Sequence, residues 1–298
     1  MWRGVFPAVT TKFTDSGDLD IAEMERCFGL QIDAGVDGII VCGSLGENMT
    51  LEPDEKLEIL RIARSAAGSK PVLMTICESS TRRGAAAAKA AAKAGAAGFM
   101  ILPGVPYKSS PEETLTHVQT VAAAGGLPVM VYNNPIAYGV DVSISMFEEL
   151  AKNDLIVAMK ESTDDIRRIT DVFNTFGDRF DVFTGVDNLA LESLLMGAHG
   201  WVAGLVVAFP KETVAIYKLV AAGRLDEARA IYRWFRPLLD LDVSTFLVQN
   251  IKLAEVYAIQ SNDRVRSPRL PLSGTERERV VGVIEKALEN RPELPKIG

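Results

Sequence analysis

The chain has 298 residues, of which 48% are hydrophobic and 24% are charged, with a formal net charge of −7 and a pI near 5.1. An acidic chain of this composition lacks the basic footprint of a nucleic-acid-binding protein and has no electrostatic attraction to an anionic membrane, so neither partner is expected. No apolar stretch reaches the roughly 18 residues of a transmembrane helix, and the first residues lack a signal-peptide pattern, which predicts a soluble, cytoplasmic protein.

Neither the cysteines nor the histidines indicate a metal site. Cys27, Cys42 and Cys77 show no metal-ligand spacing, and their odd number leaves one unpaired. Two of them lie inside apolar, strand-like runs, so we expect reduced thiols that fill the core. With His117 and His199 as its two histidines, the chain is not expected to hold a histidine-rich metal site.

Short apolar runs recur along the first two-thirds of the chain. Each is bounded by Gly, Pro or polar residues, a pattern typical of strands buried on both faces. The eight runs are VFPAVTT (5–11), GIIVCG (38–43), PVLMTIC (71–77), GFMILPG (98–104), PVMVYNNP (128–135), IVAMKES (156–162), FDVFTGVD (180–187) and GWVAGL (200–205).

Segments with helical periodicity lie between these runs. Residues 20–35 open with Asp and close with Gly, and residues 52–68 have acids in the first turn and a terminal Gly. Residues 110–125 begin with Ser-Pro and carry the spacing of a capping box. Residues 81–95 are alanine-rich, which suits a helix packed closely against a sheet.

Eight strands that alternate with helices over about 205 residues predict a (β/α)8 TIM barrel. An open, doubly wound sheet is the alternative, but no G-x-G-x-x-G follows the first run. We therefore expect a barrel over residues 1–223 that carries the active site, and a C-terminal helical region over residues 224–298. Further helical patterns after the last run lie at 210–223, 224–242, 245–260 and 275–290.

Polar residues follow most of the expected strands, at the end where barrel active sites lie. Lys160 stands directly behind an apolar run, where a lysine is costly to bury while it is charged. A surface lysine at the end of a strand is the alternative, but the ring of polar strand ends favours a functional role. These ends supply Thr10, Thr11, Gly43, Ser44, Glu78, Tyr107, Tyr132, Asn133, Lys160, Glu161, Thr184 and Asp187.

A lysine with apolar neighbours suits Schiff-base chemistry. Desolvation favours the neutral amine, which can attack a ketone, and the resulting iminium accepts electrons when a neighbouring bond breaks. Such steps need proton transfer, for which Tyr132 is a candidate, although an aromatic residue packed at a strand end is equally ordinary. The turn CGSLGEN at 42–48 has backbone N–H groups that can converge on a carboxylate. An ordinary βα turn without a binding role is the alternative interpretation of the same residues.

Three of these elements together resemble the dihydrodipicolinate synthase / N-acetylneuraminate lyase superfamily over essentially the whole chain. GSLGEN at 43–48, with Glu55 eight residues beyond Glu47, resembles the signature G-[ST]-[TG]-G-E. YNNP at 132–135 resembles the Y-N-x-P element. MKES at 159–162 places Lys160 28 residues after Tyr132 and resembles the segment with the Schiff-base lysine.

The resemblance implies a role for each matching catalytic residue. Lys160 corresponds to the imine-forming amine and Tyr132 to the phenol that transfers protons. Ser44 corresponds to a hydroxyl that links Tyr132 to a second tyrosine. Tyr107 corresponds to that second tyrosine, which in the family often reaches across a dimer interface.

The resemblance also implies how a substrate is held. The backbone amides of Ser44 and Leu45 are expected to bind its carboxylate, and the carbonyl of Val202 to line the pocket. Thr10 and Gly185, at the ends of the first and seventh strands, complete the expected substrate-binding set. The implied partner is a small-molecule carboxylate, with no metal or organic cofactor, and the implied assembly is a homotetramer built as a dimer of dimers.

Several departures from the family pattern bear on specificity. Leu45 stands where Thr or Gly is usual, Tyr138 replaces Ser or Thr, and the first strand reads VTT where TP is common. Ala137 stands where true synthases carry an arginine for the carboxylate of the second substrate. Losing that bidentate contact argues against 4-hydroxy-tetrahydrodipicolinate synthase activity.

The combination of GSLGEN with YNNPIAYG is most similar to the branch that deaminates 1-pyrroline-4-hydroxy-2-carboxylate in hydroxyproline breakdown. We expect the products to be 2,5-dioxopentanoate and ammonia. A 2-keto-3-deoxy sugar acid aldolase or dehydratase, or an N-acetylneuraminate lyase-like enzyme, is an alternative. A non-catalytic ligand-binding barrel is a further alternative from a different class.

Overall fold

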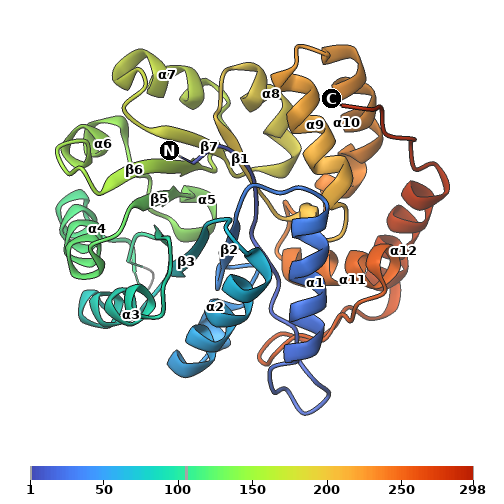
Figure 1. Ribbon diagram of the computed structural model, residues 1–298, viewed down its shortest axis with the longest axis horizontal. Coiled ribbons are helices and arrows are strands. Elements are labelled where there is room, and N and C mark those ends of the chain that lie inside the picture. Colours follow the sequence, from blue (N-terminus) through green and yellow to red (C-terminus); the bar gives the residue numbers. More distant parts are fainter. Residues whose placement is uncertain (1, 105–106, 298) are drawn as a thin grey trace.

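The computed structural model describes residues 2–104 and 107–297. Within them, eight parallel strands form a barrel in the order β1-β8-β7-β6-β5-β4-β3-β2 (Figure 1). A parallel bridge between Ala8 and Ile40 joins the two ends of this order, and the Val9 amide donates to the Ile40 carbonyl at 3.0 Å. The strands are β1 (Gly4–Pro7), β2 (Ile39–Val41), β3 (Val72–Ile76), β4 (Gly98–Ile101), β5 (Val129–Asn133), β6 (Ile156–Glu161), β7 (Asp181–Thr184) and β8 (Gly200–Ala203).

The predicted (β/α)8 barrel is confirmed, since each apolar run of the sequence overlaps one strand and helices surround the strands. The helices of the barrel are α1 (Ile21–Asp33), α2 (Pro53–Ala67), α3 (Thr81–Lys93), α4 (Pro111–Gly125), α5 (Pro135–Tyr138), α6 (Ile144–Leu150), α7 (Arg167–Phe176), α8 (Ala190–Leu195) and α9 (Pro210–Ala221). The C-terminal helices are α10 (Leu225–Leu239), α11 (Leu247–Ile259) and α12 (Gly274–Glu289). Short 3-10 helices lie at Asn48–Thr50, Asp187–Leu189 and Leu205–Val207.

Local sequence explains where the helices begin and how closely they pack. The capping box expected before α4 is present, with the side chain of Ser110 accepting from the Glu113 amide and the Glu113 carboxylate accepting from the Ser110 amide. The alanine-rich α3 lies close to its neighbour, because a Cβ at Gly84 would come within 2.9 Å of Val121 on α4. Small residues therefore set the spacing of this part of the helix layer.

Side chains alternate along each strand between the barrel interior and the helix layer. On β4, Phe99 and Ile101 pack beneath the helices, whereas Met100 belongs to a separate cluster of buried side chains inside the barrel. Ala158 of β6 and Met130 of β5 belong to the same interior cluster. A side chain two residues further along β5 or β6 therefore also points inward.

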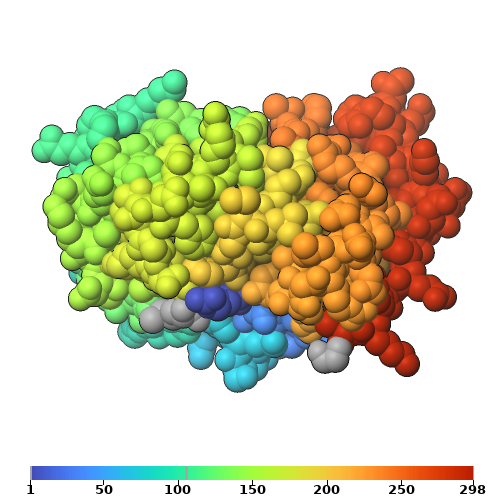
Figure 2. All heavy atoms as spheres, turned by 90° about the horizontal axis from the view of Figure 1, so that it is seen from above, coloured from blue at the N-terminus to red at the C-terminus, as the bar shows by residue number. Residues whose placement is uncertain are grey.

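The C-terminal helices pack on the barrel and share its outer hydrophobic core. Val280 and Ile284 of α12 are fully buried in the same cluster as Phe209 and Phe235. Figure 2 shows these helices as a continuous mass against one side of the barrel. Among the described residues, no helix combines the length and apolar character needed to cross a membrane.

Burial also accounts for the cysteines, all three of which are free and buried. Burial raises the pKa of the Cys42 thiol to about 12 and that of Cys77 to about 11. These thiols stay protonated at neutral pH and act as small core residues.

Candidate active site

Lys160 and Tyr132 lie side by side inside the barrel because of strand pairing and alternation. The two residues are partners in the parallel register of β5 and β6, and both are only 6% exposed. The Lys160 amine lies 4.0 Å from the centroid of the Tyr132 ring. Asn133 and Glu161, one residue further along, are buried and hydrogen-bond each other at 3.1 Å instead. The sequence thus positions an amine and a phenol as neighbours at the carboxyl end of the barrel.

Gly185 follows β7 and leaves the space that the Lys160 side chain occupies. A Cβ at this position would lie 2.3 Å from Lys160 Cε and 2.3 Å from Ser162 Oγ. The Gly185 amide donates to the Glu161 carbonyl at 2.8 Å, so its backbone is fixed against β6. Gly185 therefore determines where the lysine amine lies.

A cavity of about 110 Å³ opens above these two residues. Its size suits a small substrate, since one water molecule takes up about 30 Å³ in the liquid. A larger cavity of about 580 Å³ lies elsewhere, over α2 and α3, and neither Lys160 nor Tyr132 lines it. The smaller cavity is lined by Ala8, Gly43, Ser44, Leu45, Met100, Tyr132, Asn134, Ala137, Tyr138, Lys160, Gly185, Val202, Gly204, Asp242 and Leu247.

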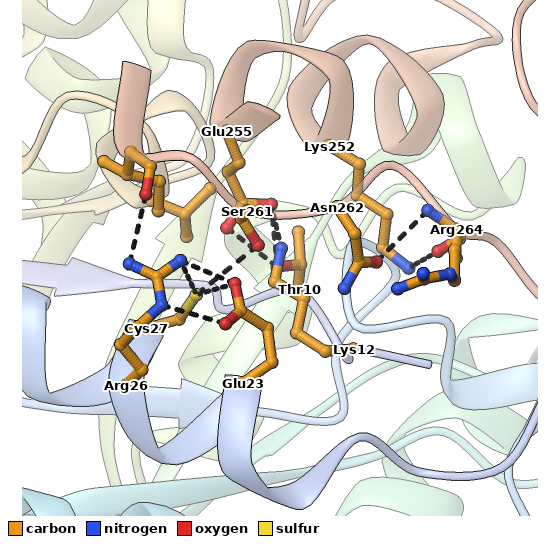
Figure 3. A network of polar contacts seen from close by, with 12 residues as sticks. Thr10, Lys12, Glu23, Arg26, Cys27, Lys252, Glu255, Ser261, Asn262 and Arg264 are labelled. Carbon is orange, nitrogen blue, oxygen red and sulfur yellow. Dashed lines mark hydrogen bonds and ion pairs between the residues drawn. The ribbon is translucent and has the colours of Figure 1, made fainter. Parts of the chain in front are cut away.

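Five of the predicted site residues line this cavity beside Lys160: Tyr132, Ser44, Leu45, Val202 and Gly185. Two others do not. Tyr107 is 59% exposed, and its hydroxyl donates to Glu113 at 2.9 Å. Thr10 is buried and donates to both carboxylate oxygens of Glu255, at 2.9 and 3.1 Å, as Figure 3 shows. The hydroxyl of Thr10 thus belongs to a buried polar network, and the contact of Tyr107 with another subunit stays a prediction.

Tyr138, which the sequence motifs did not indicate as a catalytic residue, contacts Ser44 and Tyr132 within this chain. Its hydroxyl hydrogen-bonds Ser44 Oγ, and its ring packs edge-to-face on Tyr132 with centroids 5.8 Å apart. Burial raises the pKa of Tyr138, and the neighbouring Tyr132 raises it further, so this phenol stays protonated. The Tyr132 hydroxyl in turn accepts from Asn134 Nδ2 at 3.0 Å. Two phenols and a serine hydroxyl thus gather beside Lys160.

The GSLGEN turn presents unused backbone donors to the cavity. Within residues 2–104 and 107–297, no hydrogen bond uses the amide of Ser44 or Leu45. A Cβ at Gly46 would approach the Val9 carbonyl to 3.0 Å, so a glycine lets the turn lie against the segment that follows β1. The turn is fixed, because Asn48 Nδ2 donates to the Cys42 carbonyl at 2.6 Å. Free amides in a rigid turn are suited to bind a carboxylate.

Glu47 holds this turn to the C-terminal region through a buried ion pair. Its carboxylate lies 2.5 Å from the amine of Lys252 on α11, and both side chains are 0% exposed. The Arg266 amide donates to the other carboxylate oxygen at 3.1 Å. Glu255, also on α11, forms a second buried ion pair with Lys12 at 2.6 Å, within the network of Figure 3. The C-terminal region thus helps to position the site.

Replacing Lys252 with Met is expected to lower the free energy of unfolding by about 3 kcal/mol, because the buried carboxylate of Glu47 keeps only the more distant guanidinium of Arg269, 3.8 Å away. Urea unfolding followed by circular dichroism measures the change. The double variant Lys252→Met/Glu47→Gln removes the unpaired charge and should recover part of the loss. A single variant as stable as the wild type would show that Glu47 does not depend on Lys252.

Comparison with known proteins agrees with this geometry. The model of the dihydrodipicolinate synthetase family matches residues 1–287. The chain belongs to this family. One relative, a 4-hydroxy-tetrahydrodipicolinate synthase of Methanosarcina barkeri, is 31% identical over 96% of this chain and 98% of its own length. The protein is therefore a lyase of the dihydrodipicolinate synthetase family, the family that its sequence motifs resemble.

Solved structures show the same architecture. A putative dihydrodipicolinate synthetase from Pseudomonas aeruginosa is 29% identical, with a TM-score of 0.90 over 96% of this chain and 100% of its own. YagE, a prophage protein of this family from E. coli K12 whose structure is a complex with pyruvate, is 25% identical. Its TM-score is 0.91 over 97% of this chain and 99% of its own.

Proposed function

We propose that this family member forms a Schiff base between Lys160 and the keto or imine carbon of a small 2-keto-acid-like substrate. The observation that carries the proposal is the Lys160 amine 4.0 Å from the Tyr132 ring, in a small cavity that the GSLGEN turn also lines. The complex of YagE with pyruvate supports a 2-keto acid as the kind of ligand. Lysine attack on such a carbon gives an iminium that activates the neighbouring carbon atoms.

The groups around Lys160 have separate roles in substrate binding and proton transfer. The amides of Ser44 and Leu45 receive the substrate carboxylate, which places its second carbon toward Lys160. Tyr132 gives its proton to the oxygen or nitrogen that leaves this carbon, and the resulting phenolate takes a proton from the third carbon. Tyr138, which is hydrogen-bonded to Ser44, holds a second phenolic proton next to Tyr132.

As the specific substrate we propose 1-pyrroline-4-hydroxy-2-carboxylate. Lys160 attacks the ring imine and opens the ring, the 4-hydroxyl leaves as water, and hydrolysis of the terminal and lysine imines releases ammonia and 2,5-dioxopentanoate. Overall, one water molecule is consumed and one ammonia is formed. This substrate has one carboxylate, so it does not need a second anion site in the small cavity, where the described lining offers Ala137 and no arginine.

Three alternatives are compared with this proposal. The names of the similar curated proteins favour 4-hydroxy-tetrahydrodipicolinate synthase, but Ala137 supplies no cation for the carboxylate of a second substrate. A 2-keto-3-deoxy sugar acid aldolase or dehydratase would use the same lysine and phenol. A non-catalytic ligand-binding barrel is disfavoured, because it would have no need of an amine and a phenol in contact within the cavity.

The deciding experiment is ammonia release from 1-pyrroline-4-hydroxy-2-carboxylate. The comparison panel contains 2-keto-3-deoxy sugar acids, sialic acid, and pyruvate with aspartate semialdehyde. Rapid ammonia release by the wild type supports the deaminase. Turnover of a sugar acid without ammonia release, or of pyruvate with the semialdehyde, overturns the substrate and leaves the Lys160 chemistry in place.

We also propose that the protein is a cytoplasmic homotetramer. Exposed apolar side chains near the site include Ile136 on α5 and Met49, directly after the GSLGEN segment, each 65% exposed. Contact with another subunit would cover such side chains. Sedimentation or light scattering of the purified chain measures the assembly.

A further inference from the structure

Asp242 is a titratable group in the cavity that the sequence motifs did not indicate. It follows α10, in the C-terminal region, and lines the cavity together with Lys160 and Tyr132. Its carboxyl group lies against Gly204, where a Cβ would come within 2.4 Å of Asp242 Oδ1. A glycine after β8 therefore admits an acid from outside the barrel to the active site.

Asp242 differs from its neighbour Asp187 in the polar contacts of its carboxyl group. Among the described residues, 2–104 and 107–297, no hydrogen bond or ion pair uses its oxygens. The neighbouring Asp187 is different, because it accepts from Trp201 Nε1 at 2.9 Å and from the amides of Gly204 and Leu205 at 3.1 and 2.8 Å. Asp187 is thus committed to the turn after β8, whereas Asp242 is left to interact with a ligand.

The surroundings disfavour the charged form of Asp242. Burial raises its pKa well above the usual range of a carboxyl group, and the charge of Asp187 raises it further. The Lys160 ammonium lowers the pKa of Asp242, and this effect is lost when the amine becomes part of a neutral enamine. A neutral carboxylic acid donates a proton, whereas a carboxylate accepts one.

We propose that Asp242 is the general acid that protonates the hydroxyl group leaving the fourth carbon of the Lys160-bound substrate. This inference rests on the Schiff-base chemistry of the proposed function and extends it. It makes the substrate a 2-keto acid, or its cyclic imine, with a hydroxyl on the fourth carbon that departs as water. Asp242 is a catalytic residue in this step because it touches the leaving oxygen.

The step balances without another reactant. The Tyr132 phenolate takes a proton from the third carbon, and the electron pair of that bond turns the iminium into an enamine. The enamine then re-forms the iminium, a double bond forms between the third and fourth carbons, and the bond from the fourth carbon to oxygen breaks. The leaving oxygen takes the proton of Asp242 and departs as water. Asp242 regains a proton from solvent water before the next turnover.

The proposed role of Asp242 also distinguishes among the lyase reactions. An aldol cleavage requires the same hydroxyl to lose its proton, so it calls for a carboxylate base at this position. Loss of water requires the hydroxyl to gain a proton, which a neutral carboxylic acid supplies. A general acid at Asp242 therefore predicts dehydration rather than aldehyde release.

The test compares the wild type with Asp242→Asn on two acyclic probes, 4-hydroxy-2-oxopentanoate and 4-fluoro-2-oxopentanoate. Elimination is followed by the ultraviolet absorbance of the unsaturated product, and by a fluoride electrode for the second probe. Fluoride leaves without protonation, so the fluoro probe reports the Schiff base and the deprotonation alone. Asp240→Asn is the matched control, because Asp240 is half exposed, pairs with Arg236 and does not line the cavity.

We expect Asp242→Asn to lose about 100-fold or more on the hydroxy probe, the usual contribution of a general acid, and less than about threefold on the fluoro probe. Equal loss on both probes, or no loss on either, overturns the role of Asp242. So does a wild type that forms acetaldehyde and pyruvate from the hydroxy probe, or that does not convert it. Failure of ammonia release with elimination intact rejects the proposed substrate and leaves Asp242 as the acid.

Discussion

Replacing Lys160 with Ala is expected to reduce turnover by about three orders of magnitude or more, because no other group can form the covalent intermediate. The Lys160→Arg variant should be equally inactive, since a guanidinium keeps the charge but cannot lose its proton to become a nucleophile. Borohydride reduction in the presence of pyruvate, followed by mass spectrometry, should add pyruvate to the wild type and to neither variant.

Lys152→Ala provides the control for these variants. Its side chain is 69% exposed and pairs with Glu149 on the surface, so it lacks the burial that favours a nucleophilic lysine. It should keep wild-type turnover and wild-type trapping. Turnover near the wild-type rate in Lys160→Ala would reject the Schiff-base mechanism altogether. Trapping on a lysine other than Lys160 would keep the chemistry and move the site.

The fold and the centre of the site followed from two simple periodicities. Apolar runs bounded by turn residues gave the strand count, and the alternation of βα units gave the barrel. Alternation along each strand then placed Lys160 and Tyr132 on the interior face, since Ala158 and Met130 precede them by two residues. Strand order made them neighbours. Each of these steps depends on local sequence or on a rule of barrel topology.

The surroundings of three other residues depend on contacts that those periodicities do not predict. Tyr138 ends α5, which follows β5 directly, and its hydroxyl reaches Ser44. The apolar and turn residues of this segment do not indicate the direction that the chain takes after β5. Asp242 reaches the cavity because α10 packs on the barrel and Gly204 leaves space for it. Thr10 lies beyond β1, which ends at Pro7, and Glu255 from α11 binds its hydroxyl. Contacts between segments remote in the sequence decided all three positions.

Replacing Gly185 with Ala is expected to lower kcat/KM by about 100-fold while the barrel stays folded. The added Cβ would lie 2.3 Å from Lys160 Cε and 2.7 Å from Lys160 Cγ, much closer than atoms in contact allow. The backbone of Gly185 is hydrogen-bonded to β6, so the lysine side chain has to move. A displacement of about 1 Å at a reacting group commonly costs this much in rate. The stability cost of such overpacking is smaller, about 1–3 kcal/mol.

Steady-state kinetics together with thermal unfolding distinguishes a displaced amine from a damaged fold. Gly29→Ala is the matched control, because its added Cβ meets no atom within 4 Å and α1 gains a better helix former. This control should keep full activity. If Gly185→Ala trapped pyruvate and turned over substrate at the wild-type rate, Lys160 would have room to adjust. The position of its amine would then be set by Tyr132 and the substrate, and the glycine would serve only the packing of the strand end.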